Sequence, residues 1–181
     1  MVIRGVCWRL DDNISTDHII SGKYKFEAID DLGKMAPHVF EEVIPGFYSR
    51  IRRGDVIVAG RNFGKGSSRE QAARLLKLVG VGAIVAKSFA HIFYRNAINI
   101  GLPVVVAQQI PDVAETGDVV EVDLERGVVL DVSKGFEEKF KPYPREILEI
   151  ISYGGIVEYI NKRGRPPWLG DTRLVSSKAT V

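Results

Sequence analysis

The chain has 181 residues, of which 45% are hydrophobic and 27% charged, and its formal net charge is +2. These proportions are typical of a globular protein, and we expect one compact unit with extensions. So small a net charge, without basic and aromatic residues interleaved at regular spacing, argues against a nucleic-acid partner. No apolar stretch is long enough to span a membrane, and the first residues lack the apolar segment of a secretory signal. We therefore expect a cytoplasmic protein with neither a membrane nor a nucleic-acid partner.

The cysteine and histidine content limits the chemistry that the chain can perform alone. Its one cysteine, Cys7, can neither form an internal disulfide nor hold an iron–sulfur cluster, and it lies in a predicted strand as a small apolar group. The three histidines, His18, His38 and His91, are scattered, and no pair has the spacing of a metal site. The sequence predicts that this chain binds no metal, so any metal that the reaction needs must come from another chain.

The predicted elements begin with a strand that ends at the turn cluster of residues 11–13. A polar-aromatic loop over residues 21–27 and a short helix after Asp31 follow. From residue 56 to residue 107, short apolar runs alternate with segments of helical apolar spacing, and Gly80 and Gly101 are placed as helix-ending glycines. This alternation predicts parallel strands joined by βαβ crossovers. The expected strands are 56–59, 83–86 and 103–107, and the expected helices are 69–79 and 89–99.

The last third of the chain has a different pattern. Residues 118–123 and 127–131 read as an antiparallel hairpin, and a helical region begins at Pro144 and is divided by Gly154 and Gly155. Periodicity then stops. We expect one domain over residues 1–163 and a tail over residues 164–181 that is loose or docks on a partner through Trp168.

The segment most informative about function is Gly60-Arg-Asn-Phe-Gly-Lys-Gly-Ser-Ser-Arg-Glu70, which lies where a predicted strand turns into a predicted helix. Glycines let the backbone approach a bound group, and the N–H groups at a helix start favour an anion. Hydroxyls and a guanidinium can then bind a carboxylate or a phosphate. An alternative of equal weight on local sequence alone is an ordinary helix cap, with Ser67 or Ser68 as N-cap and Glu70 completing a capping box.

Three segments together resemble the small subunit of the aconitase-like hydro-lyases, the family that includes 3-isopropylmalate dehydratase and homoaconitase. They are Asp12-Asn-Ile-Ser-Thr-Asp-His-Ile-Ile20, residues 60–70, and Ala86-Lys-Ser-Phe-Ala-His-Ile-Phe-Tyr-Arg-Asn-Ala-Ile-Asn-Ile-Gly-Leu-Pro103. The resemblance implies an α/β fold, a swivelling β/β/α domain with a parallel βαβ core and an antiparallel hairpin. It also implies a partner large subunit, in a heterodimer or heterotetramer, that carries a [4Fe–4S] cluster acting as a Lewis acid. The implied reaction isomerises a hydroxy-diacid or a tricarboxylate by removing and re-adding water.

The same resemblance assigns roles to individual residues. Ser67 matches the catalytic base, and Ser68 and Arg69 match ligands of the substrate carboxylate. Asp17 matches an active-site carboxylate, although an Asp that caps a turn is nearly as plausible on physical grounds. Lys87 and His91 are interpreted as structural or rim residues. The chain departs from the family pattern at Lys65, where many members have cysteine, and at Gln71, where most have histidine, which leaves the subfamily open.

Substrate choice is expected to depend on the loop Gly22-Lys-Tyr-Lys-Phe-Glu27. The resemblance places Phe26 at the discriminating position, and an aromatic ring cannot pair with an extra carboxylate. That favours isopropylmalate, with homoaconitate and then methylcitrate or dimethylmalate as alternatives, because Lys23 or Lys25 could meet a charge. The alternative from another class is a non-catalytic anion-binding or regulatory module. The intact Ser67-Ser68-Arg69 argues against it.

Overall fold

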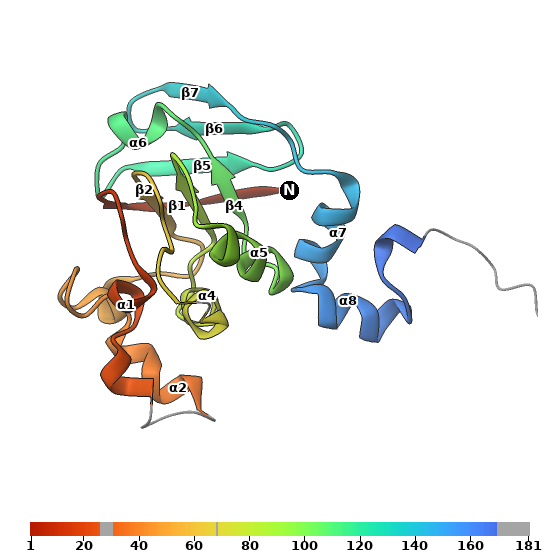
Figure 1. The fold of residues 1–181 in the computed structure, drawn as a ribbon. Helices are drawn as coiled ribbons and strands as arrows, with labels where there is room; N and C mark the ends of the chain where they lie inside the picture. The colour runs from red at the N-terminus through yellow and green to blue at the C-terminus, as the bar shows by residue number, and fades with distance from the viewer. Residues whose placement is uncertain (26–30, 68, 170–181) are drawn as a thin grey trace, which may run out of the picture.

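A curled, mixed β-sheet forms the centre of the protein (Figure 1), seen here in a computed structural model that describes residues 1–25, 31–67 and 69–169. Over these residues seven strands form one sheet in the order β4-β3-β2-β1-β5-β6-β7. The strands are β1 (Val2–Leu10), β2 (Val56–Ala59), β3 (Ala83–Ala86), β4 (Val104–Val106), β5 (Val119–Asp123), β6 (Val128–Asp131) and β7 (Phe136–Lys139).

Strand β1 joins a parallel half of the sheet to an antiparallel half. Its last four residues, 7–10, pair in parallel with β2, whereas its first five, 2–6, pair antiparallel with β5. The two ends also differ in burial, because Cys7, Trp8 and Leu10 are buried and Val2 is exposed. One long strand therefore fixes the register of both halves.

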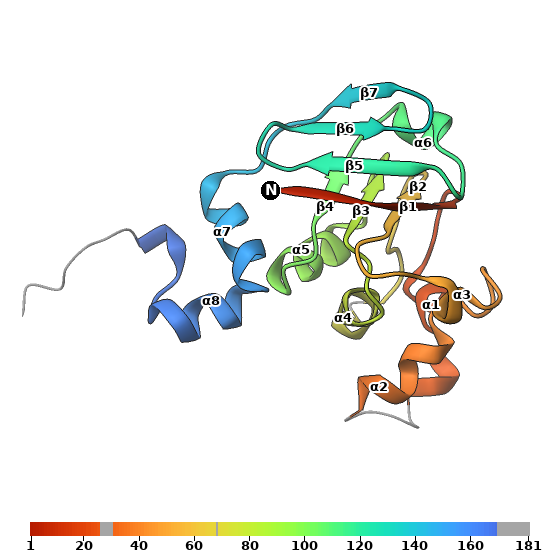
Figure 2. The same cartoon turned by 180° about the vertical axis from the view of Figure 1, so that it is seen from behind.

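The parallel half matches the expectation from sequence. Strands β2 and β3 are buried at every position, as parallel strands covered on both faces are, and their Val, Ile and Ala side chains suit that environment. Helices α4 (Glu70–Leu78) and α5 (His91–Asn99) provide the crossovers and lie on the same face of the sheet (Figures 1 and 2). The predicted βαβ core is confirmed.

The antiparallel half contains the predicted hairpin, now β5 and β6, and one strand that the sequence did not indicate. Strand β7 has the sequence Phe136-Glu-Glu-Lys139 and pairs with β6 at the sheet edge. Its charged residues fit an edge strand but lack the apolar pattern of a core strand. Helix α6 (Ile110–Val113) was also not indicated, because it is a single turn with Pro111 in its first positions.

The remaining helices lie at the two ends of the molecule (Figures 1 and 2). At the end where β1 finishes, the chain forms α1 (Thr16–Ile19), η1 (Gly22–Lys25), α2 (Leu32–Met35), η2 (Ala36–His38) and α3 (Phe47–Arg50). At the opposite end it forms α7 (Arg145–Tyr153), α8 (Ile156–Arg163) and η3 (Pro167–Leu169).

The C-terminal helices are tied to the core by a lysine. Lys77 of α4 donates from Nζ to the carbonyl oxygens of Ile100 at 2.5 Å and Gly154 at 2.7 Å, and burial lowers its pKa. Gly154 and Gly155 separate α7 from α8, as the sequence predicted, and Gly154 ends α7 in a left-handed conformation. No helix of the described residues is both long and apolar enough to cross a membrane. Trp168 is 66% exposed, and residues 170–181 of the expected tail lie outside the described residues, so its docking stays a prediction.

Candidate active site

Three loops meet at the carboxyl edge of the parallel strands, which is where open α/β sheets bind their ligands. They are residues 11–15 after β1, residues 60–69 after β2 and residues 87–90 after β3. The glycine-rich loop lies between the other two and is hydrogen-bonded to both. Its position is therefore set by the order β3-β2-β1 of the strands that precede the loops.

Backbone hydrogen bonds hold the glycine-rich loop against the loop after β1. The Gly64 N–H donates to the Ile14 carbonyl at 2.7 Å, and the Thr16 N–H donates to the Lys65 carbonyl at 2.8 Å. These bonds continue the parallel pairing of β1 and β2 beyond the strand ends, with Ser15 bridged to Lys65. The start of α1 and the end of the glycine-rich loop are thus fixed to each other.

A second set of bonds joins the glycine-rich loop to the loop after β3. The Phe63 N–H donates to the Ser88 carbonyl at 3.0 Å, and the Ala90 N–H donates to the Phe63 carbonyl at 2.9 Å. The Phe63 ring is fully buried and packs edge-on against Phe89 and Phe93. The loop is therefore a rigid support rather than a loose turn.

Two glycines of this loop cannot be replaced without strain. Gly64 has φ 79°, and a Cβ there would lie 2.2 Å from the Phe93 ring. Gly66 has φ 110°, and a Cβ there would lie 3.0 Å from the Thr16 hydroxyl. That hydroxyl is buried and has no hydrogen-bond partner among the described residues. The loop thus packs closely onto α1 just before Ser67.

Helix α4 starts directly after the loop and leaves Ser67 exposed. Arg69 occupies the N-cap position, its side chain makes no capping hydrogen bond, and its N–H donates to the Ser67 carbonyl at 2.7 Å. Ser67 is therefore not the N-cap of α4, and the simple-cap interpretation fails for this serine. Ser67 precedes the N-cap of this nine-residue helix by two residues, and the free N–H groups and the dipole at such a helix start favour a negative charge.

The structure brings Asp17 and Arg69 together across 52 residues of sequence. The Arg69 Nη1 donates to the Asp17 Oδ1 at 2.5 Å, and the two side chains are 24% and 56% exposed. Asp17 does not cap its own turn, because Ser15 and His18 form the capping box of α1. A guanidinium held on one side by a carboxylate keeps other N–H groups for a second anion.

Four other residues in or next to the three family-like segments make no contact with the Asp17–Arg69 pair among the hydrogen bonds and ion pairs of the described residues. Lys87 forms an ion pair with Asp112, at 2.5 and 2.7 Å, which agrees with a structural role. His91 is exposed at the start of α5, Gln71 is exposed on α4, and Lys65 is partly buried. Phe26 and Ser68 lie outside the described residues, so their roles stay predictions.

Sequence reasoning missed a cluster beside this site. Glu41 accepts hydrogen bonds from Lys23 and Tyr24 and contacts His38. Tyr24, His38 and Glu41 line a narrow crevice together with Asp17 and His18. Three hydrogen-bonded neighbours, Tyr24 first, then Lys23 and His38, lower the pKa of Glu41 to about 2. The sequence offered a weak signal, since His38 and Glu41 are three residues apart.

Among the described residues, no group of three or more His, Cys, Asp and Glu side chains is arranged so that it could hold a metal ion. Cys7 is buried in β1, and desolvation, with a smaller contribution from Asp118 and Asp131, raises the pKa of its thiol to about 12. A cubane cluster requires about three or four thiolates, and this chain has one cysteine. The donor set therefore does not fit a cluster within this chain.

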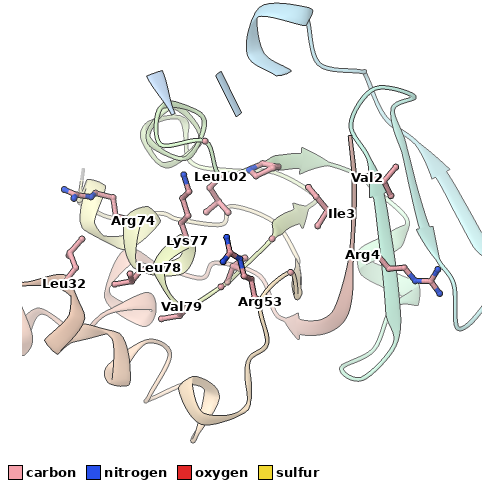
Figure 3. A pocket seen from close by; sticks show the side chains of 16 residues that line it. Val2, Ile3, Arg4, Leu32, Arg53, Arg74, Lys77, Leu78, Val79 and Leu102 are labelled. Carbon is pink, nitrogen blue, oxygen red and sulfur yellow. The ribbon is translucent and has the colours of Figure 1, made fainter. Parts of the chain in front are cut away.

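A large hollow among the described residues lies at the other edge of the sheet (Figure 3). It is an open groove of about 870 Å³, lined by residues that precede β2, β3 and β4 and by the start of β1. Figure 3 shows Arg53 and Lys77 inside it, with Arg4 and Arg74 at opposite margins. Lys77 is bound to two carbonyls, and Arg4 pairs with Glu121 at 3.7 Å. None of Asp17, Ser67 and Arg69 lines the groove, so it is separate from the candidate active site.

Known proteins that are similar to this chain show the family to which it belongs. Residues 32–109 match the family described as the aconitase C-terminal domain. The 3-isopropylmalate dehydratase small subunit 1 of Thermotoga maritima is 50% identical, over 92% of this chain and 99% of its own length. The methanogen homoaconitase small subunit of Methanothermobacter thermautotrophicus is also 50% identical, over 89% of this chain and 92% of its own. The chain belongs to the family of aconitase-like hydro-lyase small subunits.

A solved structure supports the same assignment. The crystal structure of 3-isopropylmalate dehydratase from Methanocaldococcus jannaschii is 41% identical and superposes with a TM-score of 0.82. The alignment covers 91% of this chain and 96% of that one. The family and fold that the sequence motifs predicted are thereby confirmed.

Proposed function

We propose that this chain is the small subunit of 3-isopropylmalate dehydratase, a hydro-lyase that acts only together with a cluster-bearing large subunit. One structural observation supports the proposal most directly. Ser67 is exposed at the N-terminus of α4, two residues from an Arg69 whose guanidinium is held by Asp17. The names of the similar proteins supply the reaction class and the existence of a large subunit.

In the proposed mechanism this chain binds the substrate carboxylate and moves one proton. Arg69 forms a bidentate pair with the carboxylate, which fixes the neighbouring carbon beside Ser67. Ser67, as its alkoxide, accepts at Oγ the proton from that carbon, and a double bond forms as the hydroxyl leaves the adjacent carbon. The hydroxyl leaves as water because it takes a second proton from a general acid that the large subunit would supply. In the reverse addition, water gives its hydroxide to the carbon that lost the proton and its remaining proton to that acid, and Ser67 returns its proton to the other carbon, which yields the isomer and restores the alkoxide.

A serine can serve as a base only where its anion is stabilised. The N-terminus of α4 and the positive charge of Arg69 supply that stabilisation at Ser67. The [4Fe–4S] cluster of the large subunit would supply Lewis acidity toward the substrate hydroxyl and carboxylate. Closure of this domain over the large subunit, as the swivelling domain of the family, would exclude water from the site.

The substrate that we propose is 2-isopropylmalate, and homoaconitate is the second candidate. The family resemblance assigns Phe26 to the position that reads the variable substituent, and a carboxylate placed against an aromatic ring would lack a partner. Lys23 donates to Glu41 at 2.9 Å and lies 3.6 Å from Glu42, so its charge is already compensated. This pairing favours the apolar substrate. Homoaconitate is retained as the second candidate because the homoaconitase relative and the first dehydratase relative are equally similar to this chain, each at 50% identity.

The test is the activity of this chain reconstituted with the cluster-bearing large subunit from the same genome. We expect higher kcat/KM on 2-isopropylmalate than on homoaconitate. Phe26→Arg should lower kcat/KM on the apolar substrate by about 10–200-fold, the range expected for misfit in an apolar pocket, and favour the tricarboxylate. A parent that prefers homoaconitate would refute the substrate but not the reaction class. A parent inactive on every hydroxy-diacid would support the non-catalytic alternative.

A further inference from the structure

We infer that Glu41 is a positioning residue that holds η1 against the Asp17–Arg69 pair and so sets the affinity for substrate. The inference rests on the proposed function, because it concerns the same anion site. Glu41 has no place in the proton transfer.

The side chain of Glu41 is the centre of a four-residue cluster. The Tyr24 hydroxyl donates to Glu41 Oε1 at 2.7 Å and lies 2.9 Å from Oε2. Lys23 Nζ donates to Oε1 at 2.9 Å, and His38 Nδ1 lies 2.5 Å from Oε2. The carboxylate thus binds η1 through both oxygens and η2 through Oε2, and such charge-assisted bonds are the stronger class of hydrogen bond.

Ring contacts strengthen the same cluster. The Tyr24 and His38 rings stack at 3.9 Å with an interplanar angle of 17°, and Lys23 Nζ lies 4.8 Å from the centre of the Tyr24 ring. Lys23 and Tyr24 belong to η1, whereas His38 ends η2. A short 3₁₀ helix has little stability of its own, so these contacts decide where η1 lies.

The backbone is strained where it presents Glu41. Phe40 has φ 55°, a left-handed conformation that a bulky residue rarely adopts, yet its side chain is fully buried and packs edge-on against Phe47. Its N–H donates to the Ile19 carbonyl of α1 at 3.0 Å. The core therefore fixes an unfavourable conformation at the residue before Glu41, and that residue is tied to the helix that carries Asp17.

The other end of η1 touches the anion site. A Cβ on Gly22 would lie 3.6 Å from Asp17 Oδ1 and 3.7 Å from Arg69 Nη2. One residue further on, Lys23 and Tyr24 are held by Glu41. Asp17, His18 and Ser21 line the same crevice as Tyr24, His38 and Glu41. Movement of η1 would therefore change the space available to the Arg69 guanidinium.

Charge is also balanced by this arrangement. Glu41 is an anion close to a site that must attract an anionic substrate, and Lys23 compensates it directly. The partners of Glu41 hold its pKa at about 2, so the pair stays ionised at neutral pH. Glu41 thus positions η1 without adding an uncompensated negative charge beside Arg69.

The first experiment measures steady-state kinetics on 2-isopropylmalate with the full chain reconstituted with its large subunit. Glu41→Gln and Tyr24→Phe should each raise KM by about tenfold while kcat stays within about twofold, because substrate placement and not proton transfer is affected. The matched control is Glu42→Gln, since Glu42 is 3.6 Å from Lys23 and is more exposed. An unchanged KM in both test variants, even with a lower Tm, would reduce Glu41 to a structural role and overturn the inference.

The second experiment does not depend on turnover. In NMR spectra of the free chain, Glu41→Gln and Tyr24→Phe should shift the backbone amide signals of Gly22, Asp17 and Arg69, and Glu42→Gln should not. Tyr24→Phe removes a single hydroxyl, so it serves if Glu41→Gln does not fold. Absence of these shifts would overturn the inference whatever the activity of the parent complex, whereas an inactive parent with the shifts present would count against the proposed function alone.

Discussion

Replacement of Asp55 should show how much a buried link between β1 and β2, the strands that precede the loops of the site, stabilises the fold. Asp55 is 4% exposed and stands immediately before β2. Its Oδ2 accepts hydrogen bonds from Trp8 Nε1 and from the Arg52 N–H, both at 2.9 Å, and its Oδ1 accepts one from the Val6 N–H at 3.1 Å. The carboxylate thus joins β1 to the turn before β2, and these are the strands that carry the loops of Asp17 and Ser67.

The expected magnitude follows from these three donors. Asp55→Ala leaves all three donors without this partner, and a buried unsatisfied donor costs about 1–3 kcal/mol. Two of the three donors are only partly buried, so we expect the lower part of the summed range, a loss of about 3–5 kcal/mol of unfolding free energy. Asp55→Asn can retain the two bonds to one oxygen but places an amide N–H₂ against the Val6 N–H. Because one charge-assisted hydrogen bond is lost, we expect Asp55→Asn to lower the free energy of unfolding by about 1.5–3 kcal/mol.

Urea denaturation of the isolated chain, followed by Trp fluorescence and by circular dichroism, measures both variants. Asp112→Ala is the matched control, because its carboxylate is 62% exposed and pairs with Lys87 at the surface. We expect the loss of that ion pair to lower the free energy of unfolding by less than about 1 kcal/mol. If Asp55→Ala costs no more than Asp112→Ala, or no more than Asp55→Asn, the reasoning about unsatisfied donors is refuted.

Two further predictions use the pKa values. Tyr24, Lys23 and His38 lower the pKa of Glu41 from 4.5 to about 2, so its contribution to stability is complete above pH 4.5 and is lost as the pH falls toward about 2. Glu41→Gln should therefore flatten the acid limb of the Tm-versus-pH curve in that window, and an unaltered limb would contradict the cluster geometry. Burial raises the pKa of Cys7 to about 12, so a disulfide reagent at pH 8 should titrate no thiol in the folded chain and one after unfolding. Rapid modification of the folded chain would show that Cys7 is not enclosed as described.

The parallel half of the fold could be predicted because its signals are local. The apolar runs Val56–Ala59 and Ala83–Ala86 each indicate a buried strand within four residues, and the glycines at helix ends mark where a helix stops. Strand β7 could not be predicted, since Phe136-Glu-Glu-Lys139 becomes a strand only because β6 offers it an edge. That both halves form a single sheet could not be predicted either, because it depends on β1, whose two ends pair with different strands far away in the sequence.

The site shows the same division. Ser67 and Arg69 could be proposed from the sequence because their motif is contiguous, and Asp17 because its segment matches the family. That Asp17 is bound to Arg69 depends on a contact between residues 52 positions apart, which no local pattern encodes. The Glu41 cluster was missed for the same reason, since Tyr24 and Glu41 are 17 residues apart and meet only through the fold.

The most direct test of the central claim is the kcat of Ser67→Ala, measured on 2-isopropylmalate in the complex with the large subunit, with Arg69→Lys as the contrasting variant. Removal of a general base typically costs 10²–10⁴-fold, so we predict a loss of kcat in that range with KM nearly unchanged. Arg69→Lys should mainly raise KM, because a point charge replaces a fork that matches a carboxylate. A Ser67→Ala complex that retains kcat within about tenfold of the parent would contradict the assignment of Ser67 as the base.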